Sequence, residues 1–272
     1  MTSTPASSPP FSPPPRCRRS EGADVGTRSS PATHILATPA VSTQLDFANL
    51  TGRPPGRLTM TLGRLIPGVA AVHAQELPYA QAWHEANLKA LAGDKRRWVV
   101  FGDSMSQGLG ASSPAQSWVS QLAERLPVKV DVVNLSETGA RVADVIDQQV
   151  PAWRGLPPAP HGEIITLLIG SNDQFQRGAK DHLPQQFADL LTLLPDHAIV
   201  ATLPSPRRLA GGVNAVIDAA RVSRGVRVVD TRALGEGTWR GRLAADHFHP
   251  NDHGYTAIAR MFEPAMIDAI TA

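Results

Sequence analysis

The sequence predicts an α/β fold in which a five-stranded parallel sheet carries helices on both faces. Two observations support this prediction. Continuous apolar runs, typical of strands that are buried on both sides, recur between residues 96 and 270. Segments with helical spacing of apolar residues separate them. Such alternation favours parallel strands joined by right-handed crossovers, and ligands of these sheets bind beyond the carboxyl ends of the strands.

The predicted elements follow one another along the chain with short connections. The strands are expected at residues 96–101, 128–135, 164–169, 198–203 and 226–229. The helices are expected at residues 78–92, 113–126, 142–150, 184–194, 212–223 and 251–270. Ser113 and Pro114 predict a helix start, since serine caps helices and proline is favoured at the first helical position. The first helix precedes the alternation and is expected to cover one edge of the sheet, and four prolines make residues 151–162 a predicted surface loop.

Residues 1–59 differ in composition from the rest of the chain. They hold 10 of the 24 prolines and few large apolar residues. Such a segment buries too little apolar surface to offset the entropy of ordering, so it is predicted to be a disordered tail. An alternative hypothesis is that translation starts at Met60 and that this tail lies upstream of the true start. Residues 60–95 then form an N-terminal extension with one helix, and residues 96–272 form the main domain.

Charge and cysteine content exclude several classes of protein. The formal net charge is +2, and residues 1–59 hold six arginines against three acidic residues, so the remainder is close to neutral. This balance gives no indication of nucleic-acid binding. The single cysteine, Cys17, lies in the predicted tail, which leaves the main domain without disulfides or thiolate sites.

The sequence contains no apolar run of the ~18–20 residues that span a bilayer, so no membrane insertion is expected. Residues 60–74 loosely resemble a signal peptide, but Pro67 and Gly68 break the apolar stretch. A cytoplasmic location is therefore predicted, with secretion as the alternative if residues 60–74 act as a signal peptide.

A glycine-rich segment with two serines follows the first predicted strand. It reads Gly-Asp-Ser-Met-Ser-Gln-Gly-Leu-Gly over residues 102–110. Glycines suit a sharp turn or a close backbone approach. A serine just beyond a buried strand is well placed to act as a nucleophile, which makes Ser104 the candidate and Ser106, two residues further along, the alternative. The segment taken alone is equally consistent with a simple strand-to-helix turn.

A base for this serine is found near the C-terminus. His249 lies three residues after Asp246, and a short loop with that spacing directs both side chains to one rim. Imidazole titrates in the range that a general base needs, and a carboxylate fixes its tautomer. The alternative is a metal cluster formed by His247, His249, Asp252 and His253.

A tetrahedral oxyanion requires preorganised hydrogen-bond donors. The candidates are the backbone N–H groups of Ser104 and Gly139 and the side-chain amide of Asn172, each near the end of a predicted strand. Gly139 and Asn172 are also compatible with simple turn positions. Asp103 and Asp173 are expected to bond loop backbone rather than to react.

Motifs for other chemistries are absent from the sequence. There is no Gly-x-Ser-x-Gly elbow, no phosphate-binding P-loop and no third glycine after Gly108 and Gly110 for a dinucleotide site. No cofactor and no metal are therefore predicted. Trp118, Trp153 and Phe175 are candidates to line a pocket for an acyl group, although core packing is the simpler expectation for each.

Four of these segments together resemble a known family. In order, they resemble the four blocks of the SGNH (GDSL) hydrolases: the Gly-Asp-Ser-Met-Ser segment from residue 102, Gly139, the Gly-Ser-Asn-Asp segment at 170–173, and Asp246-His-Phe-His-Pro. The resemblance covers residues 96–270. It implies a flavodoxin-like three-layer α/β/α sandwich, with residues 96–272 as the hydrolase domain.

The same resemblance implies a serine ester hydrolase of the esterase, lipase or carbohydrate O-deacylase type. Ser104, His249 and Asp246 would form the triad, and Ser104, Gly139 and Asn172 would form the oxyanion hole. An acyltransferase that uses the same site is one alternative, and a catalytically silent acyl- or glycan-binding module is another. The expected partner is a small acyl ester, and the sequence determines neither the acyl and alcohol groups nor the oligomeric state.

Overall fold

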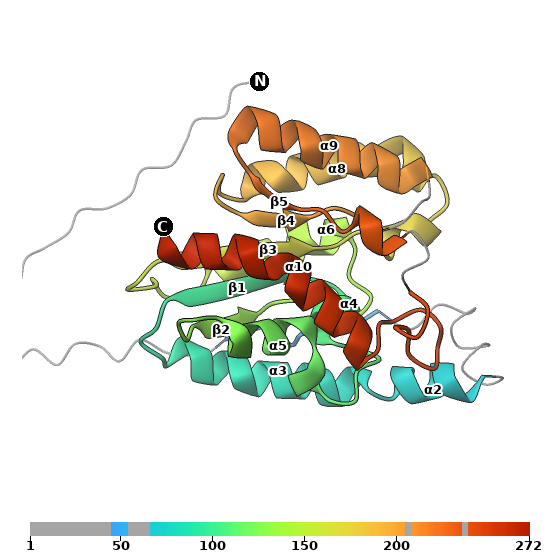
Figure 1. Ribbon diagram of the computed structural model, residues 1–272, viewed down its shortest axis with the longest axis horizontal. Coiled ribbons are helices and arrows are strands. Elements are labelled where there is room, and N and C mark those ends of the chain that lie inside the picture. Colours follow the sequence, from blue (N-terminus) through green and yellow to red (C-terminus); the bar gives the residue numbers. More distant parts are fainter. Residues whose placement is uncertain (1–44, 54–65, 205–207, 236–238) are drawn as a thin grey trace, which may run out of the picture. The chain divides into compact units, whose positions relative to one another are not determined.

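The computed structural model describes residues 45–53, 66–204, 208–235 and 239–272. Its centre is a five-stranded sheet with the order β2-β1-β3-β4-β5, in which every neighbouring pair is parallel (Figure 1). The strands are β1 (Arg97–Gly102), β2 (Asp131–Asn134), β3 (Glu163–Leu168), β4 (Ile199–Ala201) and β5 (Arg227–Val229). The predicted α/β fold with a parallel sheet is confirmed, and the strand order is the flavodoxin-like one.

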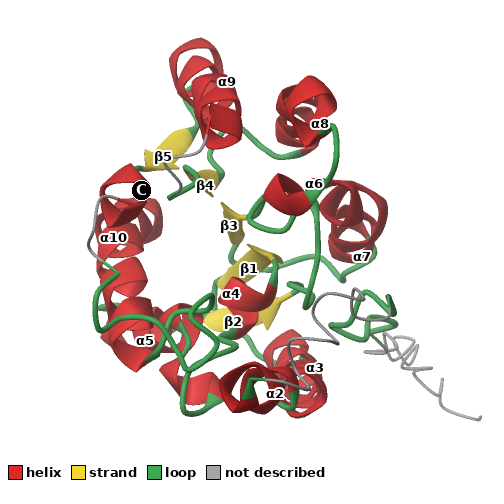
Figure 2. Cartoon of the chain, turned by 90° about the vertical axis from the view of Figure 1, so that its right-hand side faces the viewer, coloured by secondary structure: helices red, strands yellow, loops and turns green. Residues whose placement is uncertain are grey.

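Helices cover both faces of this sheet (Figure 2). One face carries α5 (Trp118–Arg125) and α10 (Asp252–Thr271). The other carries α6 (Val142–Asp144), α7 (Val150–Arg154), α8 (Ala179–Leu193) and α9 (Arg208–Arg224), with a π-helical turn (Val145–Gln149) between α6 and α7. The remaining helices are α2 (Pro67–His73), α3 (Glu76–Leu91) and α4 (Ser104–Gln107), and short 3-10 turns lie at Pro114–Gln116, Asp173–Phe175 and Arg232–Gly235. As predicted, α3 packs against the edge strand β2.

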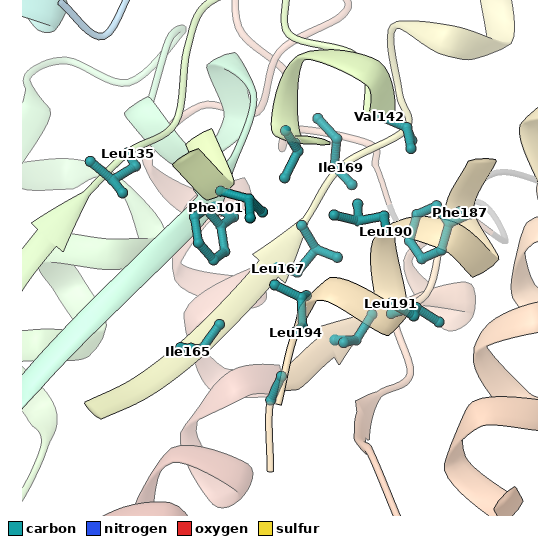
Figure 3. Close-up of a cluster of buried hydrophobic side chains, with 14 of the residues drawn as sticks. Phe101, Leu135, Val142, Ile165, Leu167, Ile169, Phe187, Leu190, Leu191 and Leu194 are labelled. Atoms are coloured by element: carbon teal, nitrogen blue, oxygen red, sulfur yellow. The ribbon is translucent and has the colours of Figure 1, made fainter. Parts of the chain in front are cut away.

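The alternation of side chains along β1 divides the core into two layers. Val99 and Phe101 pack against the helices of one face, while Trp98 and Val100 pack against α5 and α10 on the other. Figure 3 shows Phe101 in the first of these clusters. All four side chains are fully buried. Burial of a large apolar side chain contributes about 1.5–3 kcal/mol, so the two layers hold β1 from both sides. The rim at which β1 ends is therefore rigidly placed.

The start of α5 differs from the prediction. The Ser113–Pro114 pair begins only the 3-10 turn Pro114–Gln116. A second cap follows, because the Ser117 side chain accepts a hydrogen bond from the Ser120 backbone N–H at 3.1 Å. The α-helix therefore begins at Trp118.

Two helices also run through prolines that the sequence analysis treated as boundaries. α7 extends to Arg154, so the first part of the predicted loop at 151–162 is helical. Pro184 lies inside α8, which begins at Ala179. Proline inside a helix loses one backbone hydrogen bond. At Pro184, the sixth residue of α8, burial of Leu183, Phe187 and Leu190 offsets that loss.

Part of the predicted tail is folded. Residues 1–44 and 54–59 lie outside the described residues, but residues 45–53 pack against the domain, with Leu45 and Asn49 buried. Leu50 forms a parallel bridge with Thr138. The expectation of disorder over 1–59 is therefore wrong for residues 45–53, because backbone and amide hydrogen bonds hold this stretch where hydropathy gave no signal. Across the ranges that the structure describes, no helix is long and apolar enough to cross a membrane.

Candidate active site

β1 ends directly in the short helix α4, and Ser104 is the first residue of that helix. Asp103 caps α4, since its carboxylate accepts a hydrogen bond from the Met105 backbone N–H at 2.9 Å. The strand is fixed by the core and the helix by this cap. Ser104 therefore occupies a defined position at the carboxyl end of the sheet.

Two glycines allow this turn to pack closely. A Cβ atom at Gly102 would lie 2.6 Å from the Leu168 carbonyl oxygen, so β1 and β3 could not approach as they do. Gly110 has a φ of +90°, and a Cβ atom there would lie 2.6 Å from the Pro250 carbonyl oxygen and 2.8 Å from the His249 Cβ. Gly110 thus lets the histidine loop reach the serine.

The three residues predicted to form a triad are in contact. The Ser104 hydroxyl lies 2.9 Å from His249 Nε2, and His249 Nδ1 lies 2.6 Å from Asp246 Oδ2. A carboxylate can only accept, so Nδ1 carries a proton in this pair, and Nε2 of the neutral ring then accepts from the serine hydroxyl. This arrangement can take a proton from Ser104.

The loop that carries His249 is shaped around Asp246. The other carboxylate oxygen, Oδ1, accepts hydrogen bonds from the backbone N–H groups of Phe248 and His249, both at 3.0 Å. Burial raises the pKa of Asp246, but the hydrogen bond with His249 and those from the backbone outweigh it, so the pKa lies below its ordinary value. His247 adopts a left-handed conformation with a φ of +56°, which tightens the turn between the two side chains.

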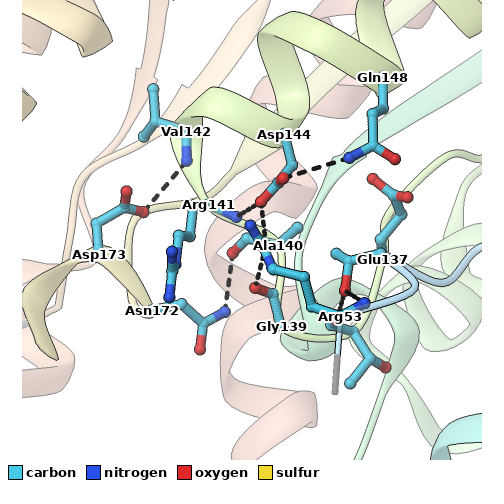
Figure 4. A network of polar contacts seen from close by, with 12 residues as sticks. Arg53, Glu137, Gly139, Ala140, Arg141, Val142, Asp144, Gln148, Asn172 and Asp173 are labelled. Atoms are coloured by element: carbon cyan, nitrogen blue, oxygen red, sulfur yellow. Dashed lines mark hydrogen bonds and ion pairs between the residues drawn. The ribbon is translucent and has the colours of Figure 1, made fainter. Parts of the chain in front are cut away.

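Gly139 and Asn172 lie in the loops that follow β2 and β3, and Ala140 links them. The Asn172 side-chain amide donates to the Ala140 carbonyl oxygen at 2.9 Å (Figure 4). An amide NH₂ has two N–H groups, so one remains to serve an oxyanion. Asp173 Oδ2 accepts from the Val142 backbone N–H at 3.2 Å, which ties the same two loops together. The predicted backbone-bonding roles of Asp103 and Asp173 agree with these contacts.

Burial also perturbs both of these acids. It raises the pKa of Asp103 to about 7, although the Met105 N–H and His249 oppose the shift. It raises the pKa of Asp173 to about 6, against the Val142 N–H and Arg141. Asp103 Oδ2 has no hydrogen-bond partner among the described residues, which agrees with a group that takes up a proton readily.

The alternatives weighed from the sequence have different positions. Ser106 lies inside α4, fully buried, and its hydroxyl has no partner among the described residues. Within residues 45–53, 66–204, 208–235 and 239–272, no group of three or more His, Cys, Asp or Glu side chains could hold a metal ion. His249 is instead engaged with Ser104 and Asp246.

The three aromatic candidates for an acyl pocket divide between core and surface. Trp118 is fully buried and stacks on Phe262 at a centroid distance of 4.2 Å, and Trp153 packs edge-on against Phe101. Phe175 is 62% exposed and lies 5.8 Å from Phe248, which is 42% exposed.

Phe248 in turn lies 4.9 Å from the His249 ring. An apolar pair therefore borders the imidazole. Phe248 is not among the pocket candidates predicted from the sequence, although its place directly before His249 was the available signal.

The sequence model of the GDSL-like lipase/acylhydrolase family matches residues 100–257, more than half of the chain. The chain belongs to this family. The family assignment, and with it the predicted SGNH (GDSL) resemblance, is confirmed. It supports an ester hydrolase or an acyl-transferring enzyme.

Solved structures of this GDSL-type fold are similar to the chain. A member of the lipolytic G-D-S-L family from Veillonella parvula is 21% identical with a TM-score of 0.52, over 61% of this chain and 96% of its own. TesA is 23% identical with a TM-score of 0.53, over 63% and 98%. The salicylyl-acyltransferase SsfX3 of a tetracycline biosynthetic pathway is 19% identical with a TM-score of 0.50, over 65% and 56%. No curated protein matches the chain.

Proposed function

We propose that the protein is a serine carboxylic ester hydrolase that uses Ser104, His249 and Asp246. The observation that carries this proposal is the continuous path from the Ser104 hydroxyl through the His249 ring to the Asp246 carboxylate. Membership of a lipolytic hydrolase family supports it.

The reaction follows from these contacts. His249 Nε2 takes the hydroxyl proton while Ser104 Oγ attacks the ester carbonyl carbon, and Asp246 stabilises the imidazolium that forms. The proton then passes to the departing alcohol oxygen, which leaves an acyl-enzyme. Water, deprotonated by His249, attacks the acyl carbon and releases the acid and free Ser104.

The oxyanion of each tetrahedral intermediate needs donors. We assign this role to the backbone N–H groups of Ser104 and Gly139 and to the Asn172 amide. No cofactor takes part in this scheme. The exposed Phe175–Phe248 pair beside His249 supports an apolar acyl group in the substrate, a small acyl ester.

Transfer of the acyl group to an alcohol instead of water uses the same intermediate. The fold similarity to a salicylyl-acyltransferase is the observation that favours this second candidate. Product analysis with and without an added alcohol or sugar acceptor separates the two reactions.

The test is a series of p-nitrophenyl esters, from acetyl to lauroyl, with acetylated carbohydrates in parallel. We expect hydrolysis by the native protein, none by Ser104→Ala, and covalent labelling of Ser104 by a fluorophosphonate. Ser106→Ala is the matched control for the labelling. A protein that neither hydrolyses any ester nor reacts with the fluorophosphonate would be a silent binding module, and the proposal would be wrong.

We further propose a cytoplasmic location. Helix α2 packs against the loop that carries Asp246, since a Cβ atom at Gly68 would overlap the Ala245 carbonyl oxygen. Cleavage after residue 74 would remove this contact, which supports retention of the segment. Cell fractionation and N-terminal sequencing of the native protein test the point, and a mature N-terminus near residue 75 in the secreted fraction would contradict it.

A further inference from the structure

Residues 45–53, here called the N-terminal arm, lie along the loop that contains Gly139. Asn49 anchors the arm: its side-chain amide donates to the carbonyl oxygens of Asn134 at 2.7 Å and Ser136 at 2.9 Å. The Gln107 side chain, at the end of α4, donates to the Asn49 carbonyl oxygen at 2.7 Å and to that of Ser136 at 3.0 Å. The arm is therefore bonded both to the serine helix and to the Gly139 loop.

Three successive carbonyl groups of that loop accept hydrogen bonds from side chains. Thr51 Oγ1 donates to the Thr138 oxygen at 3.3 Å, and Arg53 Nη2 donates to the Gly139 oxygen at 3.1 Å. The Asn172 amide donates to the next oxygen, that of Ala140. The arm thus supplies two of the three bonds, as Figure 4 shows for Arg53.

These bonds bear on the orientation of one particular N–H group. In a trans peptide unit the C=O and the N–H point in opposite directions. The Thr138 carbonyl and the Gly139 N–H belong to one unit, so a bond that holds this carbonyl toward the arm directs the N–H away from the arm. Gly139 has a φ of +73° and no side chain to restrict it, so outside contacts must fix the planes on either side.

Arg53 also balances charge behind this loop. It forms an ion pair with Asp144, whose side chain is only 9% exposed. Glu137 is buried nearby, and this burial raises its pKa to about 7. The hydrogen bond from Gln149 and the charge of Arg53 oppose the shift, and Asp144 adds to it. Without Arg53, Asp144 would lose its cationic partner behind the Gly139 loop, and the uncompensated negative charge would disfavour an oxyanion at this site.

We propose that Thr51 and Arg53 are positioning residues that set the orientation and the electrostatic environment of the Gly139 N–H for catalysis. The inference rests on the proposed function, because it concerns the oxyanion of that reaction. It assigns a catalytic contribution to a stretch whose composition predicts only a disordered tail.

The test compares Arg53→Ala and Arg53→Lys in the full chain. A misplaced oxyanion donor lowers kcat more than it raises KM, so we expect kcat of Arg53→Ala to fall by roughly 10-fold with KM changed by less than about 2-fold. Arg53→Lys keeps a cationic donor and is expected to recover most of kcat. Thr51→Val against Thr51→Ser makes a second matched pair, since only serine keeps the hydroxyl.

Arg224→Ala is the control. Arg224, the last residue of α9, also bridges a carboxylate, Asp196, and two carbonyl oxygens, which lie at the C-terminal end of α8. Equal kcat values for Arg53→Ala and Arg224→Ala would overturn the proposal.

A readout that is independent of activity separates this failure from failure of the proposed function. We expect amide hydrogen exchange in peptides that cover residues 136–144 to accelerate in Arg53→Ala and not in Arg224→Ala. Unchanged exchange there would overturn the positioning role even if the native protein hydrolyses esters. Accelerated exchange in a protein without esterase activity would refute the proposed function and the catalytic part of this inference, and would leave Arg53 with a purely structural role.

Discussion

Asp246→Asn tests whether the carboxylate sets the tautomer of His249. The variant can keep the two backbone hydrogen bonds at 3.0 Å, because the asparagine carbonyl oxygen can replace Oδ1. Its NH₂ group then replaces Oδ2, which lies 2.6 Å from His249 Nδ1. Two donors cannot share this contact, so the ring is expected to place its proton on Nε2, opposite the serine.

The expected loss follows from that switch. With a proton on Nε2, the ring cannot accept the Ser104 hydroxyl proton, and a wrong tautomer of this kind costs about 10⁴-fold in kcat. This corresponds to about 5.5 kcal/mol of transition-state stabilisation. Stability is expected to fall less, because the variant loses one charge-assisted hydrogen bond of about 1.5–3 kcal/mol and keeps the loop bonds.

The assay is steady-state hydrolysis of p-nitrophenyl acetate, with urea denaturation alongside. Asp131→Asn is the matched control, since Asp131 accepts a backbone N–H from Lys95 at 2.7 Å at the opposite end of the sheet. We expect its kcat to equal that of the native protein. If Asp246→Asn retained kcat within about tenfold while Ser104→Ala was inactive, the tautomer argument would be refuted.

Three further predictions concern the surroundings of Ser104. Asn172→Ala is expected to lower kcat by roughly 10²–10³-fold, as for other lost oxyanion donors, and an unchanged kcat in the same ester assay would remove Asn172 from that role. Phe248→Ala is expected to raise KM for octanoyl esters by roughly 3- to 10-fold relative to acetyl esters, because aromatic contacts are worth about 0.5–1.5 kcal/mol; an equal effect on both esters would contradict an acyl contact. Burial raises the pKa of Asp103 to about 7 in the folded protein, above its unfolded value. Between pH 4 and 7 the folded state therefore binds a proton that the unfolded state has lost, and stability grows as the pH falls from 7 toward 4. Asp103→Asn should remove this gain, so the slope of the unfolding free energy against pH, measured by urea denaturation, should change by up to about 1.4 kcal/mol per pH unit. An unaltered slope would show that Asp103 is ionised throughout this pH range.

The sheet could be predicted because its signal is local. In Trp98-Val-Val-Phe each residue is apolar, and a strand buried on both faces requires that pattern. Helix starts were less certain where proline was present, as at Pro114 and Pro184. Proline restricts the backbone conformation but does not by itself determine the residue at which a helix begins. Capping residues such as Ser117 determine that boundary.

The site could be predicted as a set of residues but not as a geometry. Ser104 and Asn172 were identifiable because polar residues that follow buried strands must reach the same rim of a parallel sheet. The distance from Ser104 to His249 depends on how the loop before α10 is folded. That loop relies on the left-handed His247 and on the space left by Gly110, which no periodic pattern encodes.

The N-terminal arm escaped prediction for a reason that applies to other proteins. Hydropathy measures how much apolar surface a segment can bury, and by that measure residues 45–53 have little to gain. Asn49 is nevertheless fully buried, and its side-chain amide donates to the carbonyl oxygens of Asn134 and Ser136, so the buried amide is paired. The hydrogen bonds that hold the arm thus depend on acceptors of the domain, and the position of those acceptors cannot be read from the segment itself. A chain that began at Met60 would leave those two oxygens with only their bonds from Asn87 and Gln107, which makes the arm part of the folded unit.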